Sequence, residues 1–444
     1  MSFSNLLSYS FRSYVHTTHG QKTAELPLSE KGGGTISLKR LIEENVPQLK
    51  NNTWFWQSPL LGNGHLQTVY AAVGNFENVD QIYYGRRLIT WEDGSTVSAD
   101  YVVDPPKSTA EWDESLKYCP ISDPPPYPVR TRYLTPEEIL KLHTPLNEDK
   151  PLVIALHGLS GGSHESYVRA VISQLISDKY GFECMVLNSR GCARTKITTP
   201  QLFCALMTDD IRRLVKSIRK EQPKRRIYLM GFSLGAAILA NYLGQEGDET
   251  EIDAAVPVAC PWDLAHCFYG LEYNYLGKNV YSHQMANNLL RLIKNHRQTL
   301  ADHPVFVEGQ KQKIKFINDF DEVYTAPFFG FDTAFDYYRN ASPVHRLTKI
   351  RTPTLILNAL DDPIVDYRCV PYPEVRANPY TFLATTDLGG HLGWFNPGSG
   401  RWFPQVIADF FKAFEDRIVH DHSAIKAEIK PRKRLFDGDR LVFN

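Results

Sequence analysis

Short apolar runs alternate with helical segments through the middle of the chain, and this alternation constrains the fold more than any other feature. Continuous apolar runs, typical of strands buried on both faces, lie at residues 152–157, 182–188 and 252–258. The segments between them, at residues 164–178 and 200–221, predict helices. Strands that alternate with helices at this spacing form right-handed βαβ units. The sequence therefore predicts an α/β protein with a mostly parallel central sheet flanked by helices.

One strand–turn–helix unit in this region carries a candidate nucleophile. Residues 226–243 (RIYLMGFSLGAAILANYL) combine an apolar β-rich run, a turn with the pattern G-x-S-x-G, and a run of small helix-forming residues. Ser233 projects its hydroxyl from such a turn only if its backbone is strained. A Cβ atom two residues away on either side would collide with neighbouring backbone, so we expect Gly231 and Gly235 to be required. Because glycine and serine are common in turns, the pattern alone does not establish a nucleophile.

A glycine-rich loop directly after the first apolar run is a candidate for stabilising negative charge. Residues 157–162 read HGLSGG. Such a loop can turn backbone N–H groups toward a nucleophile, and the Leu159 N–H is one predicted donor to an oxyanion. The second predicted donor is the N–H of Leu234, which follows the serine at the start of the helix. An ordinary glycine-rich turn is the alternative interpretation.

Candidates for the acid and the base follow the serine along the chain. Asp361 and Asp362 come at the end of a further apolar run, where a carboxylate can orient an imidazole. We prefer Asp362 and interpret Asp361 as a turn-capping or locally paired residue. His391, in the motif DLGGHLGW at residues 387–394, is the predicted base because its flexible neighbours let the ring reach the serine. The order Ser233, Asp362, His391 matches that of α/β-hydrolase triads.

The region before the α/β segment contains a second histidine to consider. His65 lies in the motif NGHLQT, and it is either an alternative base or, as we prefer, a buried histidine that orients a loop. Residues 83–91 and 96–103 predict two strands joined by a hairpin turn. Residues 104–150 are interpreted as an inserted surface loop, with a capping box at Thr135 that predicts one short helix.

Changes in composition divide the chain into six predicted segments. The helical, aromatic stretch at residues 261–349 separates two sheet strands and is interpreted as a cap over the active site. Its aromatic side chains either roof an apolar acyl slot or form ordinary core: Trp262, Phe268, Tyr269, Tyr273, Tyr275, Phe328, Phe329 and Phe331. The six segments are an N-terminal arm (1–53, of which 1–35 loosely attached), a hairpin region with a Pro-rich insertion (54–150), the first part of the core (151–260), the helical cap (261–349), the second part of the core (350–416) and a polar C-terminal tail (417–444).

Composition and charge argue against several classes of protein. The 444 residues include 49 basic and 50 acidic side chains, a balance that does not favour a nucleic-acid partner. Seven cysteines without a C-x-x-C pair favour a reducing compartment over a disulfide framework or a zinc site. Without a secretory signal or a membrane-spanning apolar run, we expect an intracellular, cytoplasmic protein, soluble or peripheral on lipid droplets or membranes. The basic run at residues 430–434 is interpreted as solvated, with weak contact to an anionic membrane as the alternative.

The predicted chemistry uses neither a metal nor a cofactor. The sequence has no set of metal ligands with suitable spacing, no dinucleotide-binding glycine pattern after a strand and no Walker loop. A serine, an aspartate and a histidine supply a nucleophile, an orienting carboxylate and a base on their own.

Several motifs give the chain a resemblance to one branch of the α/β-hydrolase superfamily. They are HGLSGGSHE (157–165), NSRGC (188–192), GFSLG (231–235), ANYLG (240–244), DDP (361–363) and GGH (389–391), with further similarity at residues 63–68 and 321–327. The branch contains the fungal medium-chain fatty acid ethyl ester synthase/esterases, a related fungal acylglycerol lipase and the animal abhydrolase-domain phospholipases. The resemblance, over about residues 55–415, implies Ser233, Asp362 and His391 as the catalytic triad. Phe232 and the pair Trp394 and Phe395 are most similar to the acylglycerol lipase.

The predicted function is hydrolysis of carboxylic esters through an acyl-enzyme. The resemblance implies medium-chain fatty acid esters as substrates, foremost monoacylglycerols, and also ethyl esters. The alternative is an alcohol O-acyltransferase that makes medium-chain ethyl esters from acyl-CoA and ethanol. Only the relative access of water and alcohol to the acyl-enzyme separates these two activities. A non-catalytic lipid-binding module is a third hypothesis.

Overall fold

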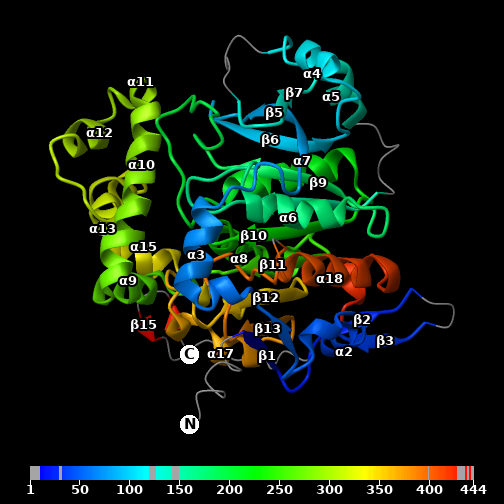
Figure 1. Cartoon of the computed structure of the whole chain (residues 1–444). Coiled ribbons are helices and arrows are strands. Elements are labelled where there is room, and N and C mark those ends of the chain that lie inside the picture. Colours follow the sequence, from blue (N-terminus) through cyan, green and yellow to red (C-terminus); the bar gives the residue numbers. More distant parts are fainter. Residues whose placement is uncertain are drawn as a thin grey trace.

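A large mixed sheet forms the centre of the molecule (Figure 1). A computed structural model describes residues 11–29, 33–119, 127–142, 150–398 and 400–427, with the backbone of 436–437 and 440–441. Among these residues, eleven strands form the central sheet. Their order is β4 (Trp54–Trp56), β1 (Arg12–His19), β13 (Thr381–Thr386), β12 (Thr354–Ala359), β11 (Ala254–Val258), β10 (Ile227–Phe232), β8 (Leu152–Leu156), β9 (Glu183–Asn188), β6 (Thr96–Val103), β5 (Tyr83–Thr90) and β7 (Thr131–Tyr133).

The middle of this sheet is parallel. The neighbouring strands from β13 to β9 pair in parallel, whereas β1, β4, β5 and β6 add antiparallel pairs toward the edges. The predicted hairpin is confirmed, because β5 and β6 pair from Tyr83 opposite Val103 to Thr90 opposite Thr96. The predicted α/β fold with a mostly parallel central sheet is confirmed as well.

Side chains of the parallel strands alternate between two apolar cores. In β8, Val153 and Ala155 face one core, which also holds side chains of α2 (Leu38–Asn45), α6 (Ser166–Leu175) and α18 (Phe403–Arg417). Leu152, Ile154 and Leu156 face the other core, with α7 (Asp209–Glu221) and α8 (Leu234–Glu246). Both faces of the strand are therefore buried, which explains its continuous apolar sequence.

Helices fill the chain between β11 and β12, and Figure 1 shows several of them gathered at one side of the sheet. They are α9 (Leu264–Tyr273), α10 (His283–Asn295), α11 (Arg297–Leu300), α12 (Pro304–Gly309), α13 (Ile317–Phe320), α14 (Ala326–Phe328), α15 (Ala334–Ala341) and α16 (Val344–Leu347), with π-helical turns at Gly277–Ser282 and Asp321–Thr325. A third apolar cluster joins α10 and α12 to Leu202 and Phe203. Leu202 and Phe203 therefore pack against these helices, and the helix predicted from residue 200 begins only at Asp209.

The N-terminal segment is not a loosely attached arm over residues 11–29, so that prediction is wrong there. β1 lies inside the sheet between β13 and β4, with Val15 opposite Thr386. Val15 and Ser13 are buried, and the Ser13 hydroxyl donates to the Leu388 carbonyl. Most residues of β1 are polar. Pairing with β13 and β4, rather than apolar packing, holds the strand in the sheet.

Residues 104–150 add structure to the far edge of the sheet, so a surface loop is an incomplete description. β7 pairs in parallel with β5, and α4 (Thr109–Ser115) was not predicted. The predicted helix is α5 (Pro136–Leu142), and its capping box is confirmed by reciprocal hydrogen bonds between Thr135 and Glu138. Residues 120–126, within the Pro-rich stretch, and 143–149 lie outside the described residues.

The remaining described elements are short. They are β2 (Glu25–Pro27), β3 (Thr35–Ser37), α3 (Gly64–Val73), α17 (Tyr372–Ala377), β14 (Phe436–Asp437) and β15 (Arg440–Leu441), with 3₁₀-helical turns at Pro47–Leu49, Pro59–Leu61, Gly247–Glu249, Tyr367–Cys369 and His422–Ala424. After α18 the chain returns to the N-terminal segment, through bridges from Leu28 to Ile418 and from Glu25 to Lys426. The basic run at residues 430–434 lies outside the described residues. In the part of the chain that is described, no helix combines the length and apolar character needed to cross a membrane.

Candidate active site

Ser233 occupies a sharp turn between β10 and α8. Its backbone has φ 53° and ψ −118°, a strained conformation for a residue with a side chain. A Cβ atom at Gly235 would lie 2.3 Å from the Leu156 carbonyl oxygen, and one at Gly231 would lie 2.5 Å from the Gly235 carbonyl oxygen. The predicted steric need for these two glycines is therefore confirmed, and the turn presents the serine hydroxyl above the sheet.

A line of hydrogen bonds joins Ser233, His391 and Asp362. The His391 Nε2 atom lies 2.8 Å from Ser233 Oγ, and its Nδ1 atom lies 2.7 Å from Asp362 Oδ2. The Asp362 side chain is fully buried and that of His391 is 10% exposed. A carboxylate only accepts hydrogen bonds, so the ring proton lies on Nδ1, and Nε2 is free to accept the proton of the serine hydroxyl. The structure thus brings together the three residues predicted from distant parts of the sequence.

The two neighbouring aspartates have different partners. Asp362 Oδ1 accepts the backbone N–H groups of Ile364 and Val365, which fixes the carboxylate that faces His391. Asp361 instead accepts the N–H of Gly390 through Oδ1, at 2.8 Å. Burial raises the pKa of Asp361 to about 7. Asp361 therefore supports the loop that carries the histidine, and Asp362 contacts the imidazole.

The predicted oxyanion donors, Leu159 and Leu234, both border the cavity that contains Ser233. Leu234 is the first residue of α8, where a helix leaves its N–H groups without intrahelical partners. Ser160, next to Leu159, has φ 54°, which marks a tight turn in the glycine-rich loop. The role of these two N–H groups as oxyanion donors stays a prediction.

His157 and Tyr167 stabilise the glycine-rich loop through hydrogen bonds with its backbone. The Gly158 N–H donates to the Tyr167 hydroxyl, and the Ser189 N–H donates to His157 Nε2. The other nitrogen of His157 therefore donates to the Gly158 carbonyl, at 2.7 Å. Burial lowers the pKa of His157 to about 4, so the ring is neutral at ordinary pH. Neither residue was predicted to have this role.

A buried ion pair anchors the far end of the same loop. Arg86 and Asp100 have fully buried side chains that form two hydrogen bonds, of 2.7 and 2.8 Å. Asp100 also accepts hydrogen bonds from the Ser163 hydroxyl and the Asn188 amide, and Asn188 in turn accepts the Ser163 N–H. The network connects the hairpin β5–β6 to the segment that follows Leu159.

Helix α3 supports the loop that carries His391, which the sequence did not predict. The His391 N–H donates to the Thr68 hydroxyl at 2.8 Å, and the Phe395 N–H donates to Gln67 Oε1 at 2.9 Å. Gly64 lies so close to Asp361 that a Cβ atom there would lie 1.9 Å from its carbonyl oxygen. The motif at residues 63–68 is therefore explained by packing against the two loops of the site. The motif NGHLQT was the sequence signal for this support, through its glutamine and threonine rather than its histidine.

His65 is not placed as a base for Ser233. It lies on α3 rather than in a loop, is only partly buried, and its Nδ1 atom lies 2.8 Å from the Tyr281 hydroxyl. The two rings are stacked with centroids 5.7 Å apart. His65 thus links α3 to the helical segment between β11 and β12, which corrects its interpretation as a buried, loop-orienting residue.

An apolar cavity of about 140 Å³ opens beside Ser233. Its walls come from the loop after β8, from residues 202–204 and from the helical segment after β11, and include Phe268, Phe328 and Phe329. Not all of the predicted aromatic cap residues lie here. Trp262 is fully buried and donates to Asn358, whereas Tyr273 and Tyr275 are exposed. Trp262 is therefore core, the exposed Tyr273 and Tyr275 fit neither interpretation, and an acyl slot lined by the three phenylalanines stays a prediction.

One acidic side chain lies on the wall of this apolar cavity. Asp321 is buried and accepts hydrogen bonds from the hydroxyls of Thr325 and Tyr338. Burial raises its pKa to about 6. Asp321 is a polar group in the cavity that the sequence did not single out, although it opens the motif at residues 321–327.

A larger cavity, of about 780 Å³, lies apart from Ser233 near the edge of the sheet that carries β5 and β7. Both basic and acidic residues line it, among them Arg132, Glu138 and Arg225. Its lining includes Leu142 and Lys150, which border a stretch outside the described residues, so we assign no ligand to it.

The strained serine turn on a parallel sheet defines the class of protein, and the chain belongs to the α/β-hydrolase family. The family model for the alpha/beta hydrolase fold matches residues 151–395. A monoacylglycerol lipase from Saccharomyces cerevisiae is 41% identical over 393 residues, which are 86% of either chain. The medium-chain fatty acid ethyl ester synthase/esterase 2 of the same yeast is 37% identical over 86% of this chain and 91% of its own. Phospholipase ABHD3 of Homo sapiens is 30% identical over 90% and 87%, respectively. The predicted resemblance to this branch is confirmed.

Proposed function

We propose that this protein is a serine ester hydrolase of the acylglycerol lipase type, which cleaves carboxylic esters of medium-chain fatty acids. The observation that carries the proposal is the hydrogen-bonded line from Asp362 through His391 to Ser233, next to an apolar cavity. A nucleophile, a base and an orienting carboxylate in this geometry are what acyl transfer from an ester requires.

The proposed reaction begins when the Ser233 oxygen attacks the ester carbonyl carbon and His391 Nε2 takes the hydroxyl proton. The N–H groups of Leu159 and Leu234 stabilise the resulting oxyanion. As the intermediate collapses, the C–O bond to the alcohol breaks, His391 returns the proton to the alcohol, and an acyl-enzyme remains. Water, deprotonated by the same nitrogen, then attacks the acyl group and releases the fatty acid. Asp362 stabilises the imidazolium in both halves of the reaction.

The apolar lining of the cavity supports a fatty acyl group as its occupant. Its volume of about 140 Å³ is close to that of an engineered apolar cavity of about 150 Å³ that binds benzene. Leu159, Leu289 and Phe328 are among the apolar side chains that would contact the chain. The names of the yeast relatives, a monoacylglycerol lipase and a medium-chain ethyl ester synthase/esterase, support monoacylglycerols and ethyl esters as the substrates.

A series of monoacylglycerols and ethyl esters of increasing chain length, with the Ser233→Ala variant as control, tests the proposal. We expect kcat/KM to be highest for medium chains and to fall for long chains, and we expect the variant to be inactive. Absence of ester hydrolysis by the wild type, or equal rates for wild type and variant, would contradict the proposal.

An alcohol O-acyltransferase is the second candidate, because one relative is named as an ethyl ester synthase. The same acyl-enzyme would form from a medium-chain acyl-CoA, and ethanol would replace water as the attacking group. Product analysis with octanoyl-CoA and ethanol separates the two activities. Hydrolysis predicts free fatty acid as the main product, and a predominance of ethyl ester would favour the transferase. A non-catalytic lipid-binding module has no support beyond the apolar cavity.

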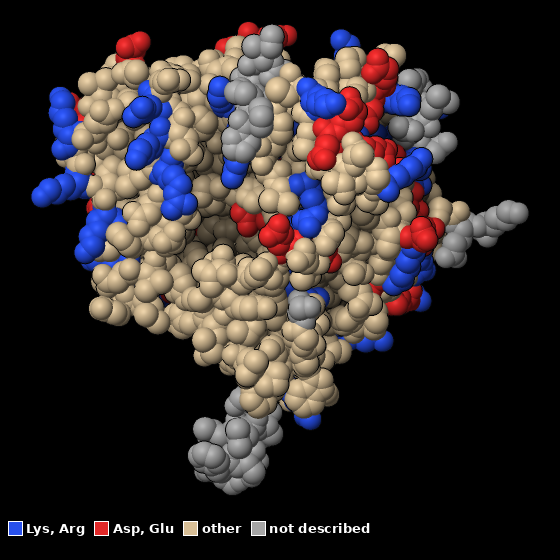
Figure 2. Space-filling model, turned by 45° about the horizontal axis from the view of Figure 1, so that its top comes forward, with Lys and Arg blue, Asp and Glu red and all other residues tan. Residues whose placement is uncertain are grey.

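An exposed apolar stripe supports contact with a lipid surface, such as a lipid droplet or membrane. Leu66, Val69 and Val73 lie at helical spacing on α3 and are exposed, with Val73 at 76%. Figure 2 shows a hollow on one face of the molecule, with a broad uncharged area below it and charges of both signs elsewhere. Because Gln67 and Thr68 on the buried side of α3 hold the His391 loop, a surface bound by the stripe would lie next to the site.

The state of the cysteines supports an intracellular location. Among the described residues no two cysteines are joined by a disulfide, and the Sγ atoms of buried Cys267 and Cys369 lie 3.7 Å apart. Cysteines without disulfide partners are typical of proteins from a reducing compartment.

A further inference from the structure

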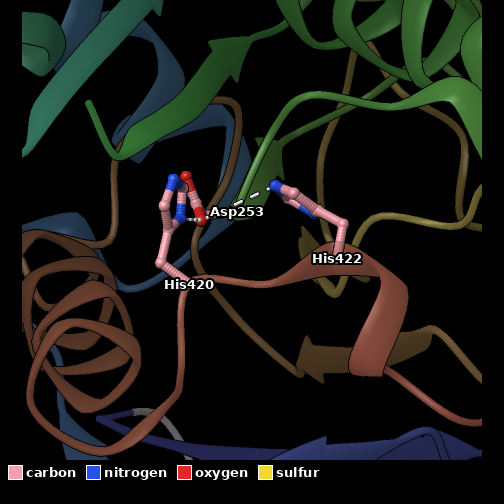
Figure 3. A group of neighbouring side chains, drawn as sticks. All are labelled: Asp253, His420 and His422. Atoms are coloured by element: carbon pink, nitrogen blue, oxygen red, sulfur yellow. Dashed lines mark hydrogen bonds and ion pairs between the residues drawn. The ribbon is translucent and has the colours of Figure 1, made fainter. Parts of the chain in front are cut away.

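A cluster of metal-ligating side chains lies at the end of the sheet opposite to Ser233. Asp253 immediately precedes β11, and His420 and His422 follow α18. Figure 3 shows both imidazoles turned toward the Asp253 carboxylate from the same stretch of chain. The candidate ligand atoms, one carboxylate oxygen and one nitrogen from each histidine, all lie within 4.8 Å of one another. Among the described residues, this is the place where such groups come together.

Hydrogen bonds fix the carboxylate so that one oxygen faces the histidines. Asp253 Oδ2 accepts the Ile227 N–H at 2.8 Å and lies 3.9 Å from the Arg219 guanidinium. Asp253 Oδ1 contacts His420 Nδ1 and lies 3.7 Å from His422 Nε2. The guanidinium repels a cation, so the site is weaker than one in which the carboxylate is unpaired.

His422 contributes a nitrogen that the protein itself does not use. Its Nε2 atom is buried and makes no hydrogen bond within the described residues. Buried polar groups in proteins nearly always have a partner, so an unpaired nitrogen that faces a carboxylate needs an explanation. A cavity of about 10 Å³, which is bordered by Asp253, His420 and His422, lies at this point. That volume is on the order of what one small bound species occupies.

The backbone around the histidines is held in place without a ligand. The Val419 N–H donates to the Pro27 carbonyl at 2.9 Å, and Ile418 and Lys426 form the bridges to the N-terminal segment. The two histidines therefore approach Asp253 from a segment that is attached on both sides of them. A ligand that joined all three side chains would fasten this segment to the start of β11.

We propose that Asp253, His420 and His422 bind a divalent first-row transition cation, for which Zn²⁺ is the suitable probe. Two imidazole nitrogens and one carboxylate oxygen are ligand types that Zn²⁺ accepts, and three protein ligands leave one position for water. The ion stabilises the junction between the C-terminal segment and the sheet. It has no part in ester cleavage, because Ser233 follows the carboxyl end of β10 and Asp253 precedes the amino end of the neighbouring parallel strand.

Zinc titration of the full-length protein, freed of metal by dialysis against a chelator, tests this proposal. His422→Gln is the main variant, since its Nε2 makes no hydrogen bond to the described residues and the metal-free variant should keep the wild-type Tm. His266→Gln is the matched control, because His266 lies 2.8 Å from Asp263 in an exposed pair without a second histidine. Calorimetry gives the stoichiometry and Kd, and thermal unfolding with and without Zn²⁺ gives a second readout.

The wild type and His266→Gln should bind one Zn²⁺ per chain, and the ion should raise their Tm. In His422→Gln the affinity should fall by about 100-fold and the Tm increase should disappear. Removal of the metal should leave ester hydrolysis unchanged. Failure of the wild type to bind Zn²⁺, or equal binding by wild type and His422→Gln, would overturn the assignment.

Discussion

Two adjacent aspartates differ in what they contact, and their substitution separates the two roles. Asp362→Asn removes the charge that holds the His391 tautomer, and we expect kcat to fall by about 10⁴-fold. Asp361→Asn keeps an oxygen for the Gly390 N–H, so it should retain most of the activity. The kcat of each variant on a medium-chain ester measures the difference. The assignment of the acid is wrong if Asp361→Asn is the inactive one.

The raised pKa of Asp361 predicts a pH dependence of stability. Its pKa is about 7 in the folded protein and 3.8 for an ordinary aspartate. Between these values the unfolded chain releases a proton that the folded protein keeps, so stability falls as pH rises through this window and is constant above it. Between pH 4 and pH 8, the free energy of unfolding of the wild type should therefore fall by up to roughly 4 kcal/mol more than that of Asp361→Asn. Denaturant unfolding at several pH values measures this, and identical pH profiles for the two proteins would contradict it.

Among the elements, α3 has two faces with separate predicted roles. Thr68, on its buried face, is a positioning residue for His391. Thr68→Val leaves the His391 N–H without its acceptor, at a cost of about 1–3 kcal/mol, so kcat should fall by about tenfold or more while KM is unchanged. Thr68→Ser keeps the hydroxyl and should restore kcat. Steady-state kinetics on a water-soluble ester gives both constants, and a variant that lost only thermal stability would show that Thr68 is merely structural.

The exposed face of α3 predicts binding to lipid. Replacement of Leu66, Val69 and Val73 by serine removes the apolar stripe and should weaken binding to phosphatidylcholine vesicles by about tenfold or more. Hydrolysis of a water-soluble ester should be unchanged. Leu140 on α5 is exposed as well but lies far along the sheet, and Leu140→Ser is the matched control. Vesicle sedimentation measures binding, and equal binding by all three proteins would exclude the stripe as the contact.

Sequence patterns predict best the strands that are buried on both faces and the turns with strict steric requirements. β8 to β12 are buried on both faces, so their apolar runs stand out, and the serine turn has sterically required glycines. β1 was not predicted because it lacks an apolar run. Its polar residues Ser13, Thr17 and Thr18 form hydrogen bonds or are partly exposed to solvent. α3 was not predicted because its apolar residues face solvent rather than the core, which reverses the usual pattern.

At the scale of the whole molecule, the candidate site depends on contacts that no local pattern encodes. The order of Ser233, Asp362 and His391 could be read from the sequence, because each lies in a recognisable motif that follows a strand, β10, β12 or β13. The hydrogen bond from the His391 N–H to Thr68 could not be read from the sequence. Nor could the buried ion pair of Arg86 and Asp100 that supports the glycine-rich loop. From the sequence alone, a charged pair in a predicted hairpin is expected on the exposed surface. In the fold, this pair is buried and hydrogen-bonded to Ser163 and Asn188.

The central claim is that Ser233 is an activated nucleophile, and reaction with a fluorophosphonate tests it most directly. Intact-protein mass spectrometry measures the adduct, and peptide mapping locates it. We expect one adduct on the wild type at Ser233, none on Ser233→Ala, and labelling slowed strongly in Asp362→Asn but not in Asp361→Asn. An unlabelled wild type, or a Ser233→Ala variant that labels at the wild-type rate, would contradict it.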